Sequence, residues 1–144
     1  MLSYLADPIA PLQVKALNAA APLLGVTLQI QDIRTADDLP AAFEAGARER
    51  AEGLLTTAES IFVAQRARVS ELAARHRLPA MYPYSIQVTD AGGLMAYDVD
   101  FADLQRRAAT YVDKILKGAK PSDLAVQQPT KFALVARFNQ FERI

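Results

Sequence analysis

The segment from Ala91 to Pro129, AGGLMAYDVDFADLQRRAATYVDKILKGAKPSDLAVQQP, is the part of the chain whose pattern decides the fold. A glycine pair opens a short apolar strand over 94–97. Asp100, with a second aspartate three residues later, predicts the N-cap of an amphipathic helix over 101–118. A glycine and then a proline end this helix, and an extended segment follows. A strand followed at once by a long helix is typical of α/β domains.

Short apolar segments and helical patterns alternate along the rest of the chain. We expect further strands over 2–6, 26–30, 53–57 and 79–83, and a last one from Phe132 to Phe138; we expect helices over 12–24, 35–52 and from Ser60 to about His76. Apolar and polar residues alternate over 26–30, which places that strand at an edge. The pattern predicts one α/β domain over 1–144: a three-layer, open, mostly parallel sheet with helices on both faces, as in flavodoxin-like folds.

Composition excludes several classes of function. The 144 residues are 51% hydrophobic, and 16 basic side chains balance 16 acidic ones. A neutral chain gives no electrostatic reason to expect nucleic acid or an anionic membrane as a partner. There is no cysteine, and His76 is the single histidine, expected at a helix C-terminus, so we expect no metal site. No apolar run is long enough for a membrane span, and the first residues lack the pattern of a secretory signal, so the chain as written would stay in the cytoplasm.

Candidate ligand-binding residues follow from the expected sheet. Ligands of open parallel sheets bind outside the carboxyl ends of the strands. The residues expected there are Asp7, Pro8, Arg34, Thr35, Glu59, Ser60, Tyr82, Tyr84, Ser85, Tyr97 and Asp98. The tyrosines could stack on a flat ligand or be ordinary half-buried side chains. Glu59 could hold a ligand ammonium group, whereas Ser60 could simply cap a helix.

No motif indicates a cofactor or an enzyme. The turn after the first strand, DPIAP, lacks the glycines of phosphate-binding loops, so we expect no nucleotide or other cofactor. Asp7 stands where a receiver domain keeps its phosphoacceptor, but no lysine follows the fifth strand. No two groups have the spacing of an acid/base pair, and we therefore expect no catalytic residues.

Several segments resemble the C-terminal lobe of ABC-transporter substrate-binding proteins, within the type I periplasmic-binding-protein superfamily. ADPIAP resembles the turn after the first strand of that lobe, and LAARHRLPAMY resembles the segment leading into its fourth strand. GGLMAYDVD and RRAATYVDKILKGAKPSDLAVQQPTKF are the most specific matches. The resemblance implies a non-catalytic lobe that binds a small organic solute, possibly an amino acid, in the periplasm.

The resemblance also implies that a partner of the lobe is missing. Such receptors have two lobes and need roughly twice this length, so we expect a fragment or remnant with weak or no binding alone; the alternative is a free-standing flavodoxin-like dimerising module of unknown role. In the family the helix over 100–118 packs on the N-terminal lobe. Its apolar stripe must therefore fold back onto its own sheet or form a homodimer interface. That stripe consists of Leu104, Ala108, Tyr111, Val112 and Ile115.

Overall fold

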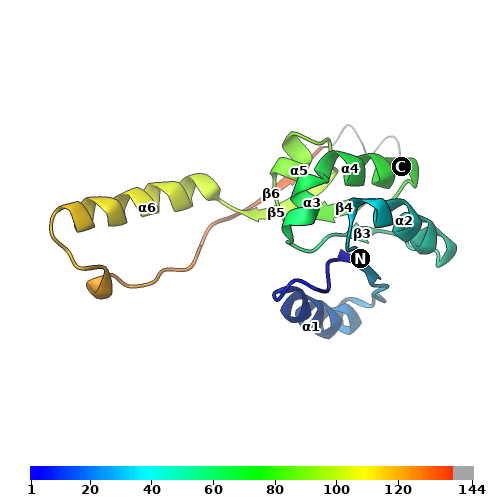
Figure 1. Cartoon of the computed structure of the whole chain (residues 1–144), viewed down its shortest axis with the longest axis horizontal. Coiled ribbons are helices and arrows are strands. Elements are labelled where there is room, and N and C mark those ends of the chain that lie inside the picture. Colours follow the sequence, from blue (N-terminus) through cyan, green and yellow to red (C-terminus); the bar gives the residue numbers. More distant parts are fainter. Residues whose placement is uncertain (138–144) are drawn as a thin grey trace.

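The computed structural model describes residues 1–137, which form a lobe and a long arm (Figure 1). The strands are β1 (Leu2–Ser3), β2 (Gln31–Asp32), β3 (Leu54–Leu55), β4 (Ala80–Tyr82), β5 (Met95–Val99) and β6 (Phe132–Ala136). The helices are α1 (Ala10–Ala20), α2 (Leu39–Arg48), α3 (Ser60–Ala64), α4 (Arg66–Arg75), α5 (Ile86–Thr89) and α6 (Phe101–Leu116). Three short 3-10 turns, η1 (Ala21–Leu24), η2 (Ala36–Asp38) and η3 (Pro121–Asp123), complete the described chain.

The strands form a mostly parallel sheet, as the sequence predicts. β1 pairs with β2, and β3, β4 and β5 pair in that order, all in parallel. A bridge between Leu2 and Thr56 joins these two groups, which gives the order β2-β1-β3-β4-β5. β6 adds antiparallel to β5, with Val99 opposite Phe132. The predicted fold class, a layered α/β sheet with helices on both faces, is confirmed.

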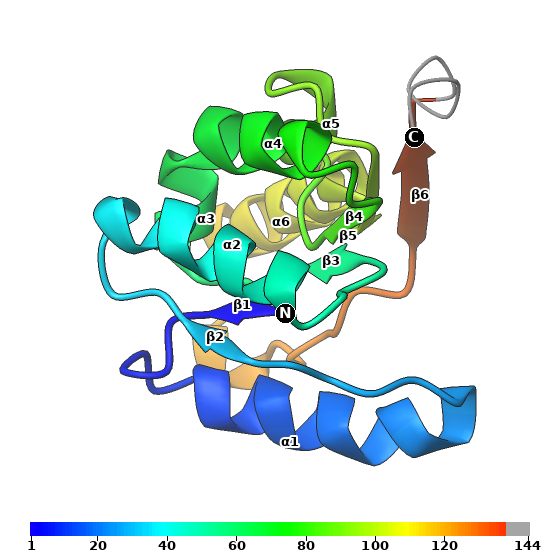
Figure 2. The same cartoon turned by 90° about the vertical axis from the view of Figure 1, so that its right-hand side faces the viewer.

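The main core lies between the sheet and helices α2 to α5. Leu54, Ala80, Tyr82 and Ala96 all point to this face, because alternate residues of a strand share a face. Phe43, Phe62 and Val69 from the helices pack against them. α1 lies on the other side of the sheet, below β1 and β2 in Figure 2. No helix in the described part of the chain is long and apolar enough to cross a membrane.

Three predicted elements differ from the structure. Residues 26–30 are not a strand: β2 begins only at Gln31, which pairs with Leu2. β2 is still the edge strand. The helix predicted from Ser60 divides at Gln65 into α3 and α4, and Ser60 is not its cap, because no side-chain bond caps α3. The helix predicted over 35–52 is shorter, with η2 before α2, and the Phe138 end of the last strand lies outside the described residues.

The arm consists of α6 and the segment that returns to β6, and it projects away from the lobe (Figure 1). Asp100 caps α6 as predicted, because its carboxylate accepts the backbone N–H of Asp103 at 2.9 Å. No residue of α6 is buried. The predicted stripe of Leu104, Ala108, Tyr111, Val112 and Ile115 therefore does not fold back onto its own sheet. Within residues 1–137 the return segment lies beside it, and there Tyr111 donates its hydroxyl to the carbonyl of Ala125.

Candidate functional site

A hollow of about 990 Å³ lies at the carboxyl ends of β3, β4 and β5, where the sequence places the ligand site. Its walls come from the loop before α3, the start of α5 and the root of the arm. The volume is in the range of small-molecule sites, which are about 300–1,000 Å³. The hollow is open to solvent rather than enclosed.

Asp98 and Asp100 both line this hollow, and Asp98 is the buried residue of the two. It is 5% exposed, and its two carboxylate oxygens accept the backbone N–H groups of Ser85 and Val99, each at 2.8 Å. Within residues 1–137 no basic side chain lies within 4.0 Å of it. A buried carboxylate that is fixed by two N–H groups but lacks a counter-charge favours a cationic group on whatever fills the hollow.

The neighbouring residues add an aromatic ring and hydroxyl groups. Tyr84 lies in the wall and donates its hydroxyl to the carbonyl of Ala58 at 3.2 Å. Ser60 and Ser85 lie in the wall as well. These three residues and Asp98 are the predicted site residues that the structure brings together.

Glu59 stands next to this group but turns away from the hollow. Its side chain is 2% exposed and accepts hydrogen bonds from the hydroxyl of Thr57 and, at 3.4 Å, from the amide of Gln13. It therefore ties α1 to the end of β3. Its carboxylate is a second buried acidic group with no basic partner within 4.0 Å among the described residues.

Two of the predicted tyrosines lie elsewhere. Tyr82 belongs to the core: its side chain is 1% exposed, its hydroxyl lies 3.4 Å from that of Ser70, and burial raises its pKa. Tyr97 points to the opposite face of β5 from Asp98, where it stacks on Phe132 with ring centroids 5.6 Å apart. Neither tyrosine lines the hollow, in contrast to the prediction. Tyr97 lies on the face of β5 opposite to Asp98, whereas Tyr82 lies on the same face as Asp98 but is buried in the core.

The predicted residues after β1 and β2 lie outside the hollow too. The carboxylate of Asp7 accepts the N–H of Ile9 in the turn that also contains Pro8. Thr35 starts η2, where Asp38 accepts its backbone N–H at 2.7 Å. Arg34 pairs with Asp32 at 2.9 Å, and this bond lowers the pKa of the Asp32 carboxyl. Each of these groups has a local structural partner.

The sequence analysis missed the apolar part of the wall. Val99, Phe101 and Ala133 at the root of the arm, with Val63 and Ile86, line the hollow. The sequence held one signal for this wall: Asp98 stands shortly before the predicted helix. Residues that follow the end of a strand lie at the same edge of the sheet as that end. No group of three His, Cys, Asp or Glu side chains that could hold a metal ion occurs in residues 1–137.

Comparisons with known proteins identify the family of this chain. The family described as ABC transporter substrate binding protein matches residues 9–143. The chain belongs to this family. Its members are of the extracytoplasmic substrate-binding type. The sequence matches none of the curated proteins.

Several solved structures share the fold at low sequence identity. A conserved domain protein from Vibrio cholerae O1 biovar eltor str. N16961 is similar with a TM-score of 0.81 at 21% identity. An ABC domain from Streptococcus pneumonia in complex with L-Trp has a TM-score of 0.81 at 18% identity. A ligand-free, open substrate-binding protein with adhesive properties from Clostridium difficile has a TM-score of 0.75 at 18% identity. Each match covers 99% of this chain but 48% of the other, so the chain spans about half the length of these structures.

Proposed function

We propose that this chain is the non-catalytic, C-terminal solute-binding lobe of an ABC-transporter receptor and that its ligand is a small organic solute with an ammonium group, such as an amino acid. The observation that carries the proposal is the Asp98 carboxylate, buried at the base of the hollow without a basic partner in the described residues. The L-Trp complex of the pneumococcal neighbour supports an amino acid. The family supports a periplasmic location.

Weak binding by the lobe alone is part of the proposal. Good small-molecule sites bury about 70–90% of the ligand surface. The open hollow would enclose a ligand only in part, and the similar solved structures are about twice as long as this chain. We therefore expect this chain to act as a fragment of a two-lobed receptor.

Nuclear magnetic resonance detects weak binding and distinguishes ligand groups. L-Tryptophan should shift the backbone amide signals of Ser85 and Val99, which donate to Asp98. Indole-3-propionic acid, which lacks the ammonium group, should shift them much less. Asp98→Asn should remove most of the difference, because it removes the negative charge that attracts the ammonium.

The matched control is Asp90→Asn, since Asp90 is an exposed carboxylate outside the hollow. Circular dichroism must show that Asp98→Asn still folds, because an amide at this position leaves one backbone N–H unsatisfied at a cost of about 1–3 kcal/mol. Equal shifts with both compounds, in the unaltered chain, would contradict the ammonium-binding role of Asp98.

A further inference from the structure

The sheet of this lobe has one covered face and one bare face over β3 to β6. Leu55, Met81 and Met95 lie opposite one another on three neighbouring strands, and Ala136 continues the row on β6. This row points away from the core that α2 to α5 cover. On the same face, Tyr97 is 57% exposed and Leu134 is 64% exposed.

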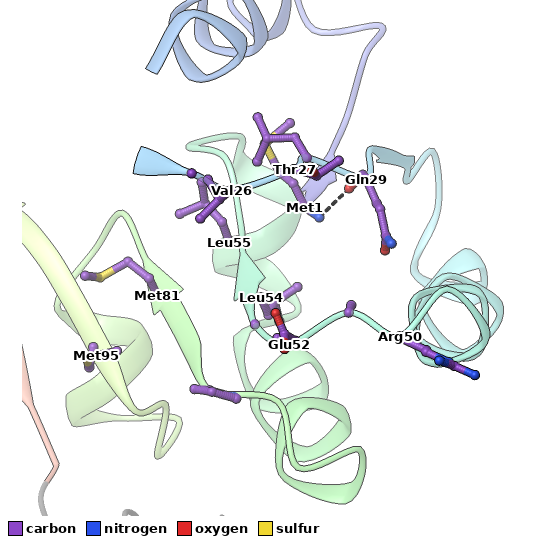
Figure 3. A pocket seen from close by; sticks show the side chains of 15 residues that line it. Met1, Val26, Thr27, Gln29, Arg50, Glu52, Leu54, Leu55, Met81 and Met95 are labelled. Carbon is purple, nitrogen blue, oxygen red and sulfur yellow. Dashed lines mark hydrogen bonds between the residues drawn. The ribbon is translucent and has the colours of Figure 1, made fainter. Parts of the chain in front are cut away.

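A hollow of about 540 Å³ lies on this bare face, where Leu55, Met81 and Met95 line it. Figure 3 shows the side chains of Leu55, Met81 and Met95 along the strands, with Val26 and Met1 beside them. Methionine side chains are flexible and adapt to partners of irregular shape. The described residues provide no helix over this face.

Helix α6 of the same chain packs on no sheet within the described residues. On α6, Val112 is 56% exposed, and Leu116, next to the apolar stripe, is 81% exposed. Leu104, Ala108, Tyr111 and Ile115 of the stripe line a hollow together with the return segment, so Val112 and Leu116 form its uncovered edge. The 16 residues of α6 make a rod about 24 Å long and about 10 Å wide. Four strands at about 4.8 Å spacing present a face about 14 Å wide, which accommodates one helix.

The charges of the two parts are complementary. The lobe, residues 1–99 and 132–137, has 11 acidic and 9 basic side chains, a net charge of −2. Residues 100–131 have 4 acidic and 6 basic ones, a net charge of +2. The arm points away from its own lobe, so the two surfaces do not meet within one chain (Figure 1).

We infer that two copies of this chain pair by exchanging arms, so that the stripe of α6 of each copy lies on the bare face of β3 to β6 of the other. The pairing buries both unpartnered surfaces at once and places a positive arm on a negative lobe. It also places the second copy at the root of the arm, where Val99, Phe101 and Ala133 line the ligand hollow. The second copy then supplies the wall that the open site lacks.

Cross-linking tests this arrangement directly, because the chain has no cysteine of its own. Leu116→Cys and Met81→Cys are prepared separately, labelled with different tags, mixed, and treated with a short bismaleimide. The expected product is a covalent dimer that carries both tags. Mixed Thr110→Cys and Met81→Cys should give little product, since Thr110 lies on the opposite side of α6 from the stripe. A strong product between two Leu116→Cys chains would overturn the exchange, because the arms would then pair with each other.

Light scattering over a dilution series gives the second measurement. The unaltered chain should have the mass of a dimer, and Val112→Asp with Leu116→Asp should raise the dissociation constant at least about 100-fold. Thr110→Asp is the control on the same helix and should change it little. Since Val112 and Leu116 are exposed in the single chain, circular dichroism should show an intact fold. A monomer mass at about 1 mM for the unaltered chain would overturn the proposal and leave a segment outside this sequence as the partner of the arm.

Discussion

At the scale of single residues, Gly93 marks the closest packing between β4, α5 and the start of β5. A Cβ atom on Gly93 would lie 2.5 Å from a ring carbon of Tyr82 and 2.7 Å from the carbonyl oxygen of Gln87. Both neighbours are buried and fixed, so they cannot give way. We expect Gly93→Ala to destabilise the fold by about 1–3 kcal/mol, measured by urea unfolding.

Gly46→Ala is the matched control for this prediction. Gly46 lies within α2, and its new methyl group would meet Ala51 at an ordinary 3.7 Å. Alanine is preferred over glycine in helices, so this variant should be more stable by about 0.5–1 kcal/mol. If Gly93→Ala unfolded at the same urea concentration as the unaltered chain, the packing described around Tyr82 would be wrong.

The residue scale also shows the limit of reading a site from the sequence. Asp98, Ser85, Tyr84 and Ser60 could be predicted, because the carboxyl ends of parallel strands share one edge. Tyr82 could not be separated from them, since the sequence does not show that its ring packs in the core on the same face of the sheet as Asp98. The apolar wall at the root of the arm required the position of β6, which returns from 30 residues further along the chain.

At the scale of elements, local sequence signals such as a helix cap predicted the structure correctly. Features that depend on contacts between distant segments, such as strand pairing, were not all predicted correctly. The cap of α6 at Asp100 follows from local chemistry that the sequence displays. The helix predicted over 12–24 ends at Ala20, and a 3-10 turn that contains Pro22 follows it. The division of the predicted helix at Gln65 has no such signal, since neither glycine nor proline occurs there. The strand predicted over 26–30 failed because alternation cannot show whether a partner strand lies opposite.

The first turn of α6 permits a test of electrostatics. Lys131 at the start of β6 donates to the Asp103 carboxylate at 2.8 Å, and this bond lowers the pKa of Asp103. We expect Lys131→Ala to raise that pKa toward the ordinary value of about 3.9, measured by NMR titration of the carboxyl carbon. Because the pKa is lowered in the fold, this pair stabilises the root of the arm above about pH 4 and the effect is lost as the pH falls through the folded pKa.

Lys120→Ala serves as the control for this titration, since Lys120 lies in the return segment and no salt bridge joins it to Asp103. It should leave the titration curve of Asp103 in place. An unchanged curve with Lys131→Ala would show that Arg106 and Arg107, at 3.6 and 4.0 Å, determine the pKa instead.

At the scale of the whole molecule, the lobe has a core of its own, to which the arm contributes no buried residue. The sequence predicted a mostly parallel sheet but not the order of its strands, and it left open whether α6 folds back onto that sheet. Local patterns show that a helix is amphipathic but not which surface it meets. In the structure the core lies entirely in the lobe, α6 contributes no buried residue to it, and β5 and β6 join as an antiparallel pair at the root.

This division predicts that the arm can be deleted. Val99 and Phe132 lie directly opposite each other, so a two-residue Asn-Gly turn can replace residues 100–131 and close β5 and β6 into a hairpin. The shortened lobe should fold, with NMR signals of the core residues near Phe43, Phe62 and Val69 close to those of the full chain. It should also be a monomer at concentrations where the full chain pairs, because it lacks the helix that lies on the second copy. A shortened chain that unfolds would show that the arm stabilises its own lobe, whereas one that still pairs would place the interface on the lobe alone.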